Sequence, residues 1–180
     1  MFYYWYRIIR ILIGKNFQQQ VDIEAELSRK FTVRLFDCDG LRVMTAFKYA
    51  AYMDFIRWEM IARSKFYNGI VLKGLAPTIG SQKIIYRKPL KRWTQFTLKV
   101  HTAGWDEKWI YHIHKFEQKG EIKAVGITRC LIWKKDKPQI LQQILKNAGV
   151  KDLDKKTPDW VLNLFQNDAD IIANNFELIK

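Results

Sequence analysis

The sequence predicts an α+β fold in which an antiparallel sheet curls around one enclosed helix. Residues 45–64 are long enough for about five helical turns. Their apolar side chains point in nearly every direction, and such a helix is enclosed by the rest of its protein. One strand-like segment precedes this helix and four follow it in series, which is the order of a meander that wraps a helix.

The N-terminal segment, residues 1–14, combines aromatic side chains with Arg7 and Arg10 on an aliphatic turn. It is too short and too often interrupted by charge to span a bilayer, and it lacks the cleavage site of a signal peptide. We expect a helix that packs on its own domain or on a partner subunit, or one that contacts the membrane interface peripherally.

Residues 16–29 are typical of a polar connector, and residues 31–35 alternate as in a half-buried strand. We expect this strand to end at the acid pair Asp37 and Asp39, where Gly40 permits a turn. Two carboxylates beside a buried helix are costly unless they are paired, hydrogen-bonded or neutralised. The pair is therefore the first place to look for function.

Beyond the central helix, strands are expected at residues 77–86, 95–100, 109–116 and 122–133, with a hairpin turn at residues 118–120. The tail is predicted to be helical. Pro138 begins one helix that Gly149 ends, and Thr157 caps another that has Pro158 at its first position.

The whole chain of 180 residues fits one core. It divides into an N-terminal helix and connector (1–29), a sheet-and-helix domain (30–135) and a C-terminal helical extension (136–180).

The net charge of +13 indicates an anionic partner: a phosphate-rich group, nucleic acid or an anionic membrane. A solvated basic surface is the alternative. Cys38 and Cys130 make neither a disulfide framework nor a zinc site, so we expect a reducing, cytoplasmic compartment. His112 and His114 share a strand face without ligands to complete a metal set, so we expect surface or core histidines and no metal site.

The order of strand, buried helix and four-strand meander, with Asp37 and Asp39 before the helix, resembles the hotdog-fold thioesterases. The 4-hydroxybenzoyl-CoA thioesterase-like branch, and within it the thioesterase-superfamily-member proteins, is the most similar. The resemblance covers residues 31–133. The further matching residues are Tyr49, Asp54, Phe55, Arg57 and Glu59 on the helix, the segment Tyr86-Arg87-Lys88-Pro89-Leu90, the pair Trp105-Asp106, Tyr111 and Phe116.

The resemblance implies an acyl-CoA or acyl-carrier-protein thioesterase, active as a homodimer or a dimer of dimers with its sites at the subunit interface. It implies that Asp39 acts as nucleophile or general base, and that backbone N–H groups at Thr45 and Ala46 polarise the thioester carbonyl. Coenzyme A is expected only as part of the substrate, with no other cofactor. Many relatives carry a His and then paired Asn where this chain has Val43, Thr45 and Ala46; the benzoyl-type branch manages without that His.

The implied site is also chemically reasonable. A helix N-terminus offers unpaired N–H donors to an oxyanion, and a nearby carboxylate can attack the thioester or activate water. The alternative for Asp39 is a cap that accepts backbone N–H groups. Glu59 is a second candidate base, with pairing to Arg63 as its more frequent alternative. Asp54 and Arg57 are three residues apart and can pair.

Residues 61–104 contain no acid, and we expect the basic residues Arg87, Lys88, Lys91 and Arg92 to hold the phosphates of coenzyme A. The apolar residues Phe55, Trp58 and Met60 either line an acyl pocket or are plain core. A non-catalytic protein that holds acyl thioesters or lipids near a membrane is the alternative function, favoured by Val43 and Ala46. A nucleic-acid binder is suggested only by charge and aromatic content, since no recognised motif supports it.

Overall fold

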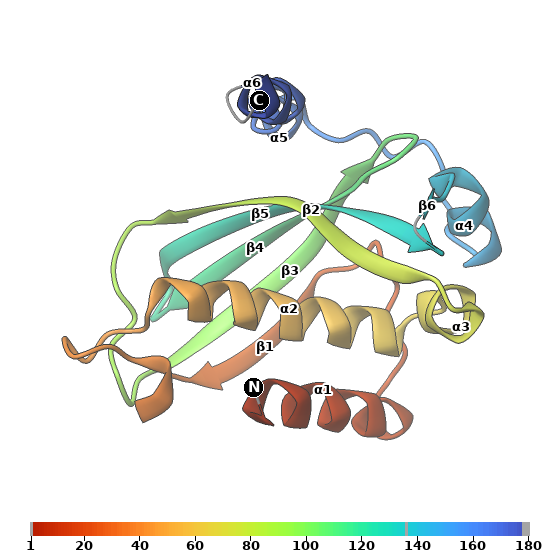
Figure 1. The fold of residues 1–180 in the computed structure, drawn as a ribbon. Helices are drawn as coiled ribbons and strands as arrows, with labels where there is room; N and C mark the ends of the chain where they lie inside the picture. The colour runs from red at the N-terminus through yellow and green to blue at the C-terminus, as the bar shows by residue number, and fades with distance from the viewer. Residues whose placement is uncertain (1, 136, 178–180) are drawn as a thin grey trace.

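A curled antiparallel sheet encloses one long helix, and shorter helices lie at both ends of the chain (Figure 1). The computed structural model describes residues 2–135 and 137–177. The strands are β1 (Leu27–Thr32), β2 (Ala76–Tyr86), β3 (Gln95–Trp105), β4 (Ile110–Gln118), β5 (Glu121–Lys134) and β6 (Lys137–Pro138). Their order is β1-β3-β4-β5-β2, every pairing is antiparallel, and β6 pairs with β5. The four strands predicted after the central helix are confirmed.

The helices are α1 (Phe2–Gly14), α2 (Ala46–Arg63), α3 (Phe66–Gly69), α4 (Leu141–Asn147), α5 (Asp159–Asn163) and α6 (Asp168–Glu177). Three 3-10 turns, η1 (Lys15–Phe17), η2 (Leu35–Asp37) and η3 (Val71–Lys73), lie in the connections between helices and strands. Figure 1 shows α2 lying along the concave side of the sheet, with α1 packed on the side of α2 away from the sheet and α5 and α6 over the opposite face.

The enclosure predicted for α2 is confirmed. Tyr52 and Met53 are fully buried, and the Tyr52 ring lies 5.3 Å from that of Phe96 on β3. A Cβ at Gly126 on β5 would come within 2.4 Å of the Met53 sulfur, so the missing side chain lets α2 approach the sheet closely. A second apolar cluster, which includes Val161 and Phe165, packs on the outer face of the sheet. The C-terminal extension therefore covers that face.

The first strand differs from the prediction. It spans Leu27–Thr32 instead of residues 31–35, so it starts inside the segment assigned to the connector. Its ladder with β3 ends at Thr32 opposite Gln95, the first residue of β3. Beyond it, the Val33 amide donates to the Thr94 carbonyl at 3.0 Å and the Val33 carbonyl accepts the Trp93 amide at 2.8 Å, and the chain then turns into η2. The acid pair consequently lies on η2 and the loop after it, not at the end of a strand.

Two predicted helix starts are also corrected. Pro138 pairs with β5 as part of β6, and α4 begins only at Leu141. Thr157 does not cap α5, whose N-cap is Pro158 without a side-chain hydrogen bond. Thr157 instead packs against Gly104, where a Cβ would lie 2.6 Å from the Thr157 amide nitrogen.

His112 and His114 on β4 are core residues. Both are buried, and Nε2 of His114 lies 3.5 Å from Arg57 on α2. Burial, together with the charge of Arg57, lowers the pKa of His112 to about 3 and holds the pKa of His114 well below its usual value. Among the described residues, no group of three His, Cys, Asp or Glu side chains is placed to hold a metal ion.

These histidines predict acid sensitivity. Below pH 6.5 the unfolded chain binds protons that the folded core excludes, so the free energy of unfolding should fall as the pH drops from 6.5 toward 3. Each histidine contributes a slope of up to about 1.4 kcal/mol per pH unit. Urea unfolding of wild type and His112→Gln across this range checks it, and an equally steep acid slope in the variant would contradict it.

Candidate active site

Asp37 is a buried carboxylate with a complete set of partners. Its side chain is 1% exposed. Oδ2 accepts the Tyr52 hydroxyl at 2.8 Å and the Arg34 amide at 2.9 Å, while Oδ1 lies 3.1 Å from Nζ of Lys48. Burial and the adjacent Asp37 charge raise the pKa of Tyr52 far above its ordinary value, so this hydroxyl stays a proton donor. Asp37 therefore fastens the loop before α2 to the helix itself.

Asp39 is different, because it is exposed. Its Oδ1 accepts the Leu41 amide at 2.9 Å, and its own amide donates to the Val43 carbonyl at 3.1 Å. A bridge between Cys38 and Met44 closes the same turn. The capping alternative for Asp39 is thus present as a local turn that uses one carboxylate oxygen, and the other oxygen faces solvent without a hydrogen bond from the described residues.

The start of α2 supplies the backbone donors, with one correction. The Thr45 amide donates to the Asp37 carbonyl at 2.9 Å, so it is not free to bind an oxyanion. The amides of Ala46 and Phe47 make no hydrogen bond to any described residue, and both residues are exposed. The open donors at the start of α2 are therefore the amides of Ala46, one of the two residues predicted, and of Phe47, for which the sequence carried no signal.

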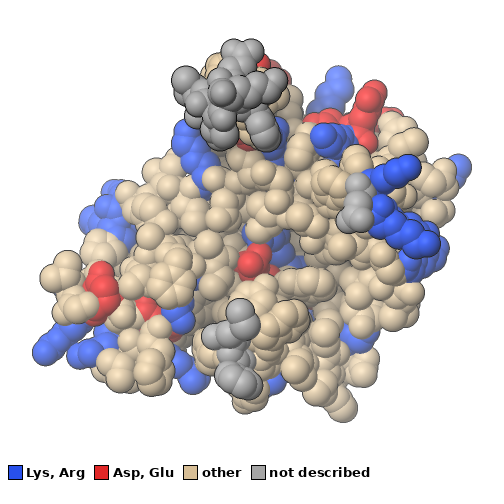
Figure 2. All heavy atoms as spheres, viewed as in Figure 1, with Lys and Arg blue, Asp and Glu red and all other residues tan. Residues whose placement is uncertain are grey.

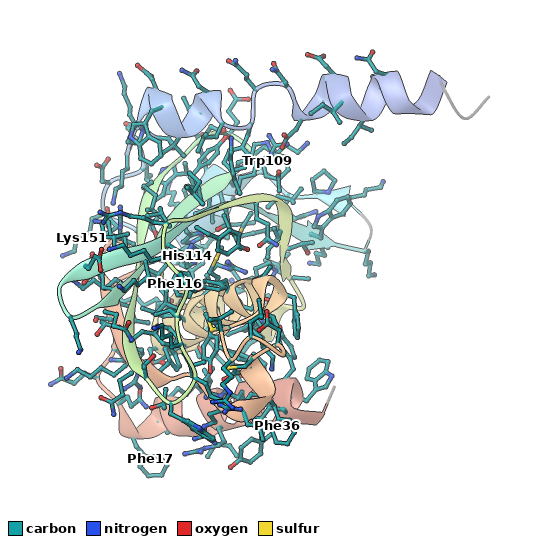
Figure 3. All side chains as sticks on the ribbon, turned by 90° about the vertical axis from the view of Figure 1, so that its left-hand side faces the viewer. Phe17, Phe36, Trp109, His114, Phe116 and Lys151 are labelled. Atoms are coloured by element: carbon teal, nitrogen blue, oxygen red, sulfur yellow. The ribbon has the colours of Figure 1, made fainter. Side chains whose placement is uncertain are left out.

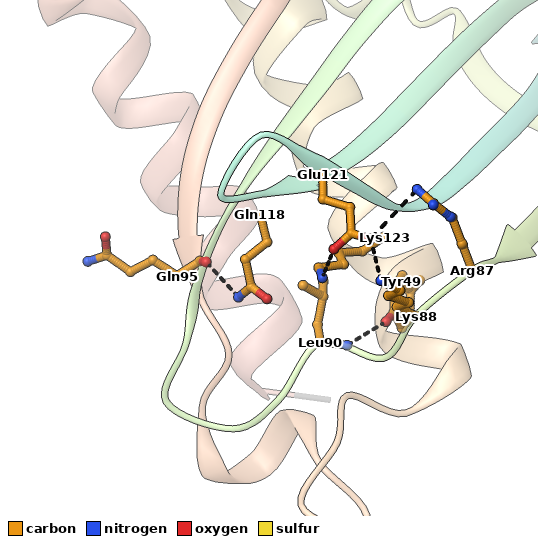
Figure 4. Close-up of polar contacts among 8 residues, drawn as sticks. All are labelled: Tyr49, Arg87, Lys88, Leu90, Gln95, Gln118, Glu121 and Lys123. Carbon is orange, nitrogen blue, oxygen red and sulfur yellow. Dashed lines mark hydrogen bonds and ion pairs between the residues drawn. The ribbon is translucent and has the colours of Figure 1, made fainter.

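Residues 86–93 pack beside this helix start. The Leu90 carbonyl accepts the Met44 amide at 2.8 Å, and the Leu90 amide donates to the Tyr49 hydroxyl at 3.3 Å (Figure 4). The Tyr86 hydroxyl lies 3.5 Å from the Ala46 carbonyl. These contacts place all four predicted basic residues, Arg87, Lys88, Lys91 and Arg92, on a segment that adjoins the loop of Asp39.

Two of these four cations are already engaged. Figure 4 shows Glu121 between Arg87, Lys88 and Lys123. A carboxylate oxygen of Glu121 lies 3.7 Å from a guanidinium nitrogen of Arg87, 2.5 Å from Nζ of Lys88 and 2.6 Å from Nζ of Lys123. The hydrogen bonds from Lys123 and Lys88 lower the pKa of Glu121 to about 2, so it stays ionised. Lys91 and Arg92 have no carboxylate partner in the described part of the chain, which leaves them available to an anion.

A lysine-walled cleft of about 810 Å³ lies against the same segment. It runs between residues 88–97 and the β4–β5 hairpin, and Glu117 is its acidic lining residue. Its basic lining residues are Lys30, Lys88, Lys91, Lys119 and Lys123.

Glu59 does not join this site. At the rise of an α-helix it lies about 20 Å from Ala46 along α2. Its Oε1 accepts Arg29 from β1 at 2.6 Å and Arg63 at 2.8 Å. The predicted alternative, pairing with Arg63, is present, and Glu59 holds β1 against α2. The predicted pair of Asp54 and Arg57 is also present.

The predicted apolar lining is mostly core. Phe55 and Met60 are buried among core side chains. Trp58 is half-buried and lines a narrow pocket of about 60 Å³ between α2 and β2, together with Ile79 and the Asp54–Arg57 pair. On the face of the molecule that is seen in Figure 2, acidic and basic atoms lie together in a hollow near the centre.

Apolar side chains project into solvent around Asp39. Phe36 before it is 86% exposed and, in Figure 3, lies out near the N-terminal helix. Leu41 in the same loop and Phe47 in the first turn of α2 are exposed as well. Large exposed apolar patches mark interaction sites, so this surface is suited to a further partner.

The chain belongs to the Thioesterase-like superfamily, whose family model matches residues 33–162. Its sheet wrapped around α2 is the hotdog fold. No curated protein matches the chain significantly.

Solved structures share this fold at low identity. The DHNA-CoA thioesterase from Staphylococcus aureus is 18% identical with a TM-score of 0.59, over 84% of this chain and 94% of that one. The probable thioesterase YbaW from Escherichia coli is 17% identical with a TM-score of 0.61, over 68% and 98%. The BH1999 gentisyl-coenzyme A thioesterase is 15% identical with a TM-score of 0.58, over 69% and 100%.

The site generates a stability prediction. Tyr52→Phe leaves the buried Asp37 without one partner and should lower the free energy of unfolding by about 1.5–3 kcal/mol. Tyr111→Phe is the matched control, because the Tyr111 hydroxyl bonds Asp106 at the same 2.8 Å but Asp106 is exposed and water can replace it. Urea unfolding should show a smaller loss for Tyr111→Phe, and equal losses would contradict the role given to Asp37.

Proposed function

We propose that this protein hydrolyses an acyl thioester to a carboxylic acid and a thiol. The observation that carries the proposal is the exposed Asp39 carboxylate on the loop that leads into α2, whose amides at Ala46 and Phe47 are open. A carboxylate and open backbone donors at a helix N-terminus are the parts that acyl transfer requires.

The reaction follows from these parts. Asp39 takes a proton from water as the water oxygen attacks the thioester carbonyl carbon, or Asp39 attacks that carbon itself. The carbonyl oxygen becomes an oxyanion, which the N–H groups of Ala46 and Phe47 and the positive end of α2 stabilise. Collapse breaks the C–S bond, and the thiolate takes up a proton, from Asp39 in the first route and from solvent in the second. In the second route, water then hydrolyses the acyl–Asp39 anhydride, which releases the carboxylic acid and restores Asp39.

Coenzyme A is the carrier that the surroundings favour. Lys91, Arg92 and the lysine-walled cleft adjoin the site and offer cations to its phosphates. Two proteins of similar fold are named as thioesterases of coenzyme A derivatives, which supports the same substrate class. An acyl-carrier protein is the competing carrier, since the same basic residues would also attract it electrostatically.

A second copy of the chain would complete the site. Phe36, Leu41 and Phe47 expose apolar surface beside Asp39, and β2 is an edge strand of the sheet. A homodimer, alone or in a dimer of dimers, would cover both.

A non-catalytic binding role is the second candidate. One oxygen of Asp39 is held by the Leu41 amide, and Val43 beside it is apolar where many relatives carry a polar residue. A protein of this kind would bind acyl-CoA with saturation and release no thiol.

Thiol release from short, aromatic and long acyl-CoAs tests the proposal. Asp39→Asn should reduce turnover by roughly 100-fold or more, because it removes the base or nucleophile. Asp22→Asn is the matched control, since Asp22 is also exposed and accepts the amide two residues on, at Glu24. It should keep full turnover. Equal turnover in Asp39→Asn and wild type would overturn the role of Asp39, and saturable binding without any turnover would select the binding role.

A further inference from the structure

Helix α1 buries one face and exposes the other. Ile8 is buried, and Ile11 and Leu12 pack half-buried against the core. The opposite face presents an apolar stripe of four residues that are 52–61% exposed: Trp5, Tyr6, Ile9 and Ile13. Phe17, just beyond α1, is 86% exposed and projects at the same end of the molecule in Figure 3. No helix in the described ranges is long and apolar enough to cross a membrane.

A basic crevice of about 440 Å³ adjoins this stripe, between α1 and β1. Tyr6 belongs to both surfaces, so the two are continuous. The cations that line the crevice are Arg7, Arg10, Arg29, Lys30 and Arg34. Its acidic lining residue, Glu59, is bound to Arg29 and Arg63.

The remaining four cations of the crevice have no carboxylate partner among the described residues. Arg7 is held in place by aromatic rings, with its guanidinium 5.3 Å from the Tyr3 ring centroid and 5.4 Å from that of Phe31. Arg10 and Arg34 are exposed at the rim. Like charges gathered without a counter-ion repel one another, so an anion in the crevice would relieve that repulsion.

We propose that α1 lies in the interfacial layer of an anionic membrane and that the crevice receives a lipid headgroup phosphate. Aromatic and aliphatic side chains on one helix face, bordered by arginines, are the composition of an interfacial helix. Headgroup phosphates lie at the depth of such a helix, where the stripe would enter the acyl boundary and the crevice would meet the phosphate. The two surfaces together thus bind one partner.

Vesicle co-sedimentation of the full chain tests the proposal. The protein should bind vesicles that contain phosphatidylcholine and phosphatidylserine. Its binding to vesicles of phosphatidylcholine alone should be roughly fivefold weaker. Trp5→Glu with Ile9→Glu should reduce binding roughly tenfold or more. Trp160→Glu is the matched control: Trp160 is 53% exposed against 58% for Trp5, and it lies on α5 at the opposite end of Figure 1.

The crevice is tested separately. Arg10→Glu with Arg34→Glu should reduce binding to the anionic vesicles roughly tenfold or more. Lys146→Glu with Lys151→Glu, which alters two exposed lysines of the C-terminal extension, should leave binding unchanged. Circular dichroism checks that each variant folds. Insertion of the intact stripe is tested by the quenching of Trp5 fluorescence by brominated lipid, with Trp5→Phe as the reference.

Three results would overturn the proposal. The first is unchanged vesicle binding in the stripe or crevice variants, or no binding by the wild type. The second is displacement of the wild type from vesicles by millimolar inorganic phosphate while the stripe variant still binds them, which would assign the crevice to free phosphate. The third is a fall from dimer to the 21.5 kDa monomer in the stripe variant without vesicle binding by the wild type, which would assign the stripe to a second copy. Thioester turnover is measured on the same samples and does not enter these outcomes.

Discussion

The buried carboxylate of Asp37 is the interaction on which the candidate site depends. It accepts the Tyr52 hydroxyl and pairs with Lys48, both on α2, while its own backbone carbonyl accepts the Thr45 amide at the helix start. A buried charge is stable only while its partners stay in place, so the loss of any one of these contacts should weaken the others. The loop that carries Asp39 is consequently fixed by the helix that carries the oxyanion donors, and both halves of the site share one anchor.

The sequence predicted the enclosed helix and the strands after it because their signals are local. Apolar residues in all directions identify α2, and alternation identifies β3. The acid pair could not be resolved in this way, since the two acids look alike in sequence. What separates them is Tyr52, fifteen residues along the chain from Asp37. Glu59 shows the same limit: Arg63 is visible as a neighbour on the helix, but Arg29 lies thirty residues away on β1.

The net charge of +13 acquires a meaning only through its placement. In the lysine-walled cleft, Glu121 engages Lys88 and Lys123 and leaves Lys91 unpaired. In the crevice beside α1, Glu59 engages Arg29 and leaves four cations unpaired. In each basic cluster, some cations are thus ion-paired with a carboxylate, while others have no carboxylate partner among the described residues. Composition counts the cations, but only the fold decides which of them remain available to a phosphate.

The central claim, that Asp37 positions the loop of Asp39, is tested most directly by amide hydrogen exchange in wild type and Asp37→Asn. In Asp37→Asn, exchange should be faster across residues 38–45, including the Met44 and Thr45 amides, while the amides of β3 and β4 keep their protection. The same variant should lose thioester turnover although Asp39 is untouched. Unchanged exchange at Thr45 would contradict the account, because the loop would then hold its place without the buried charge.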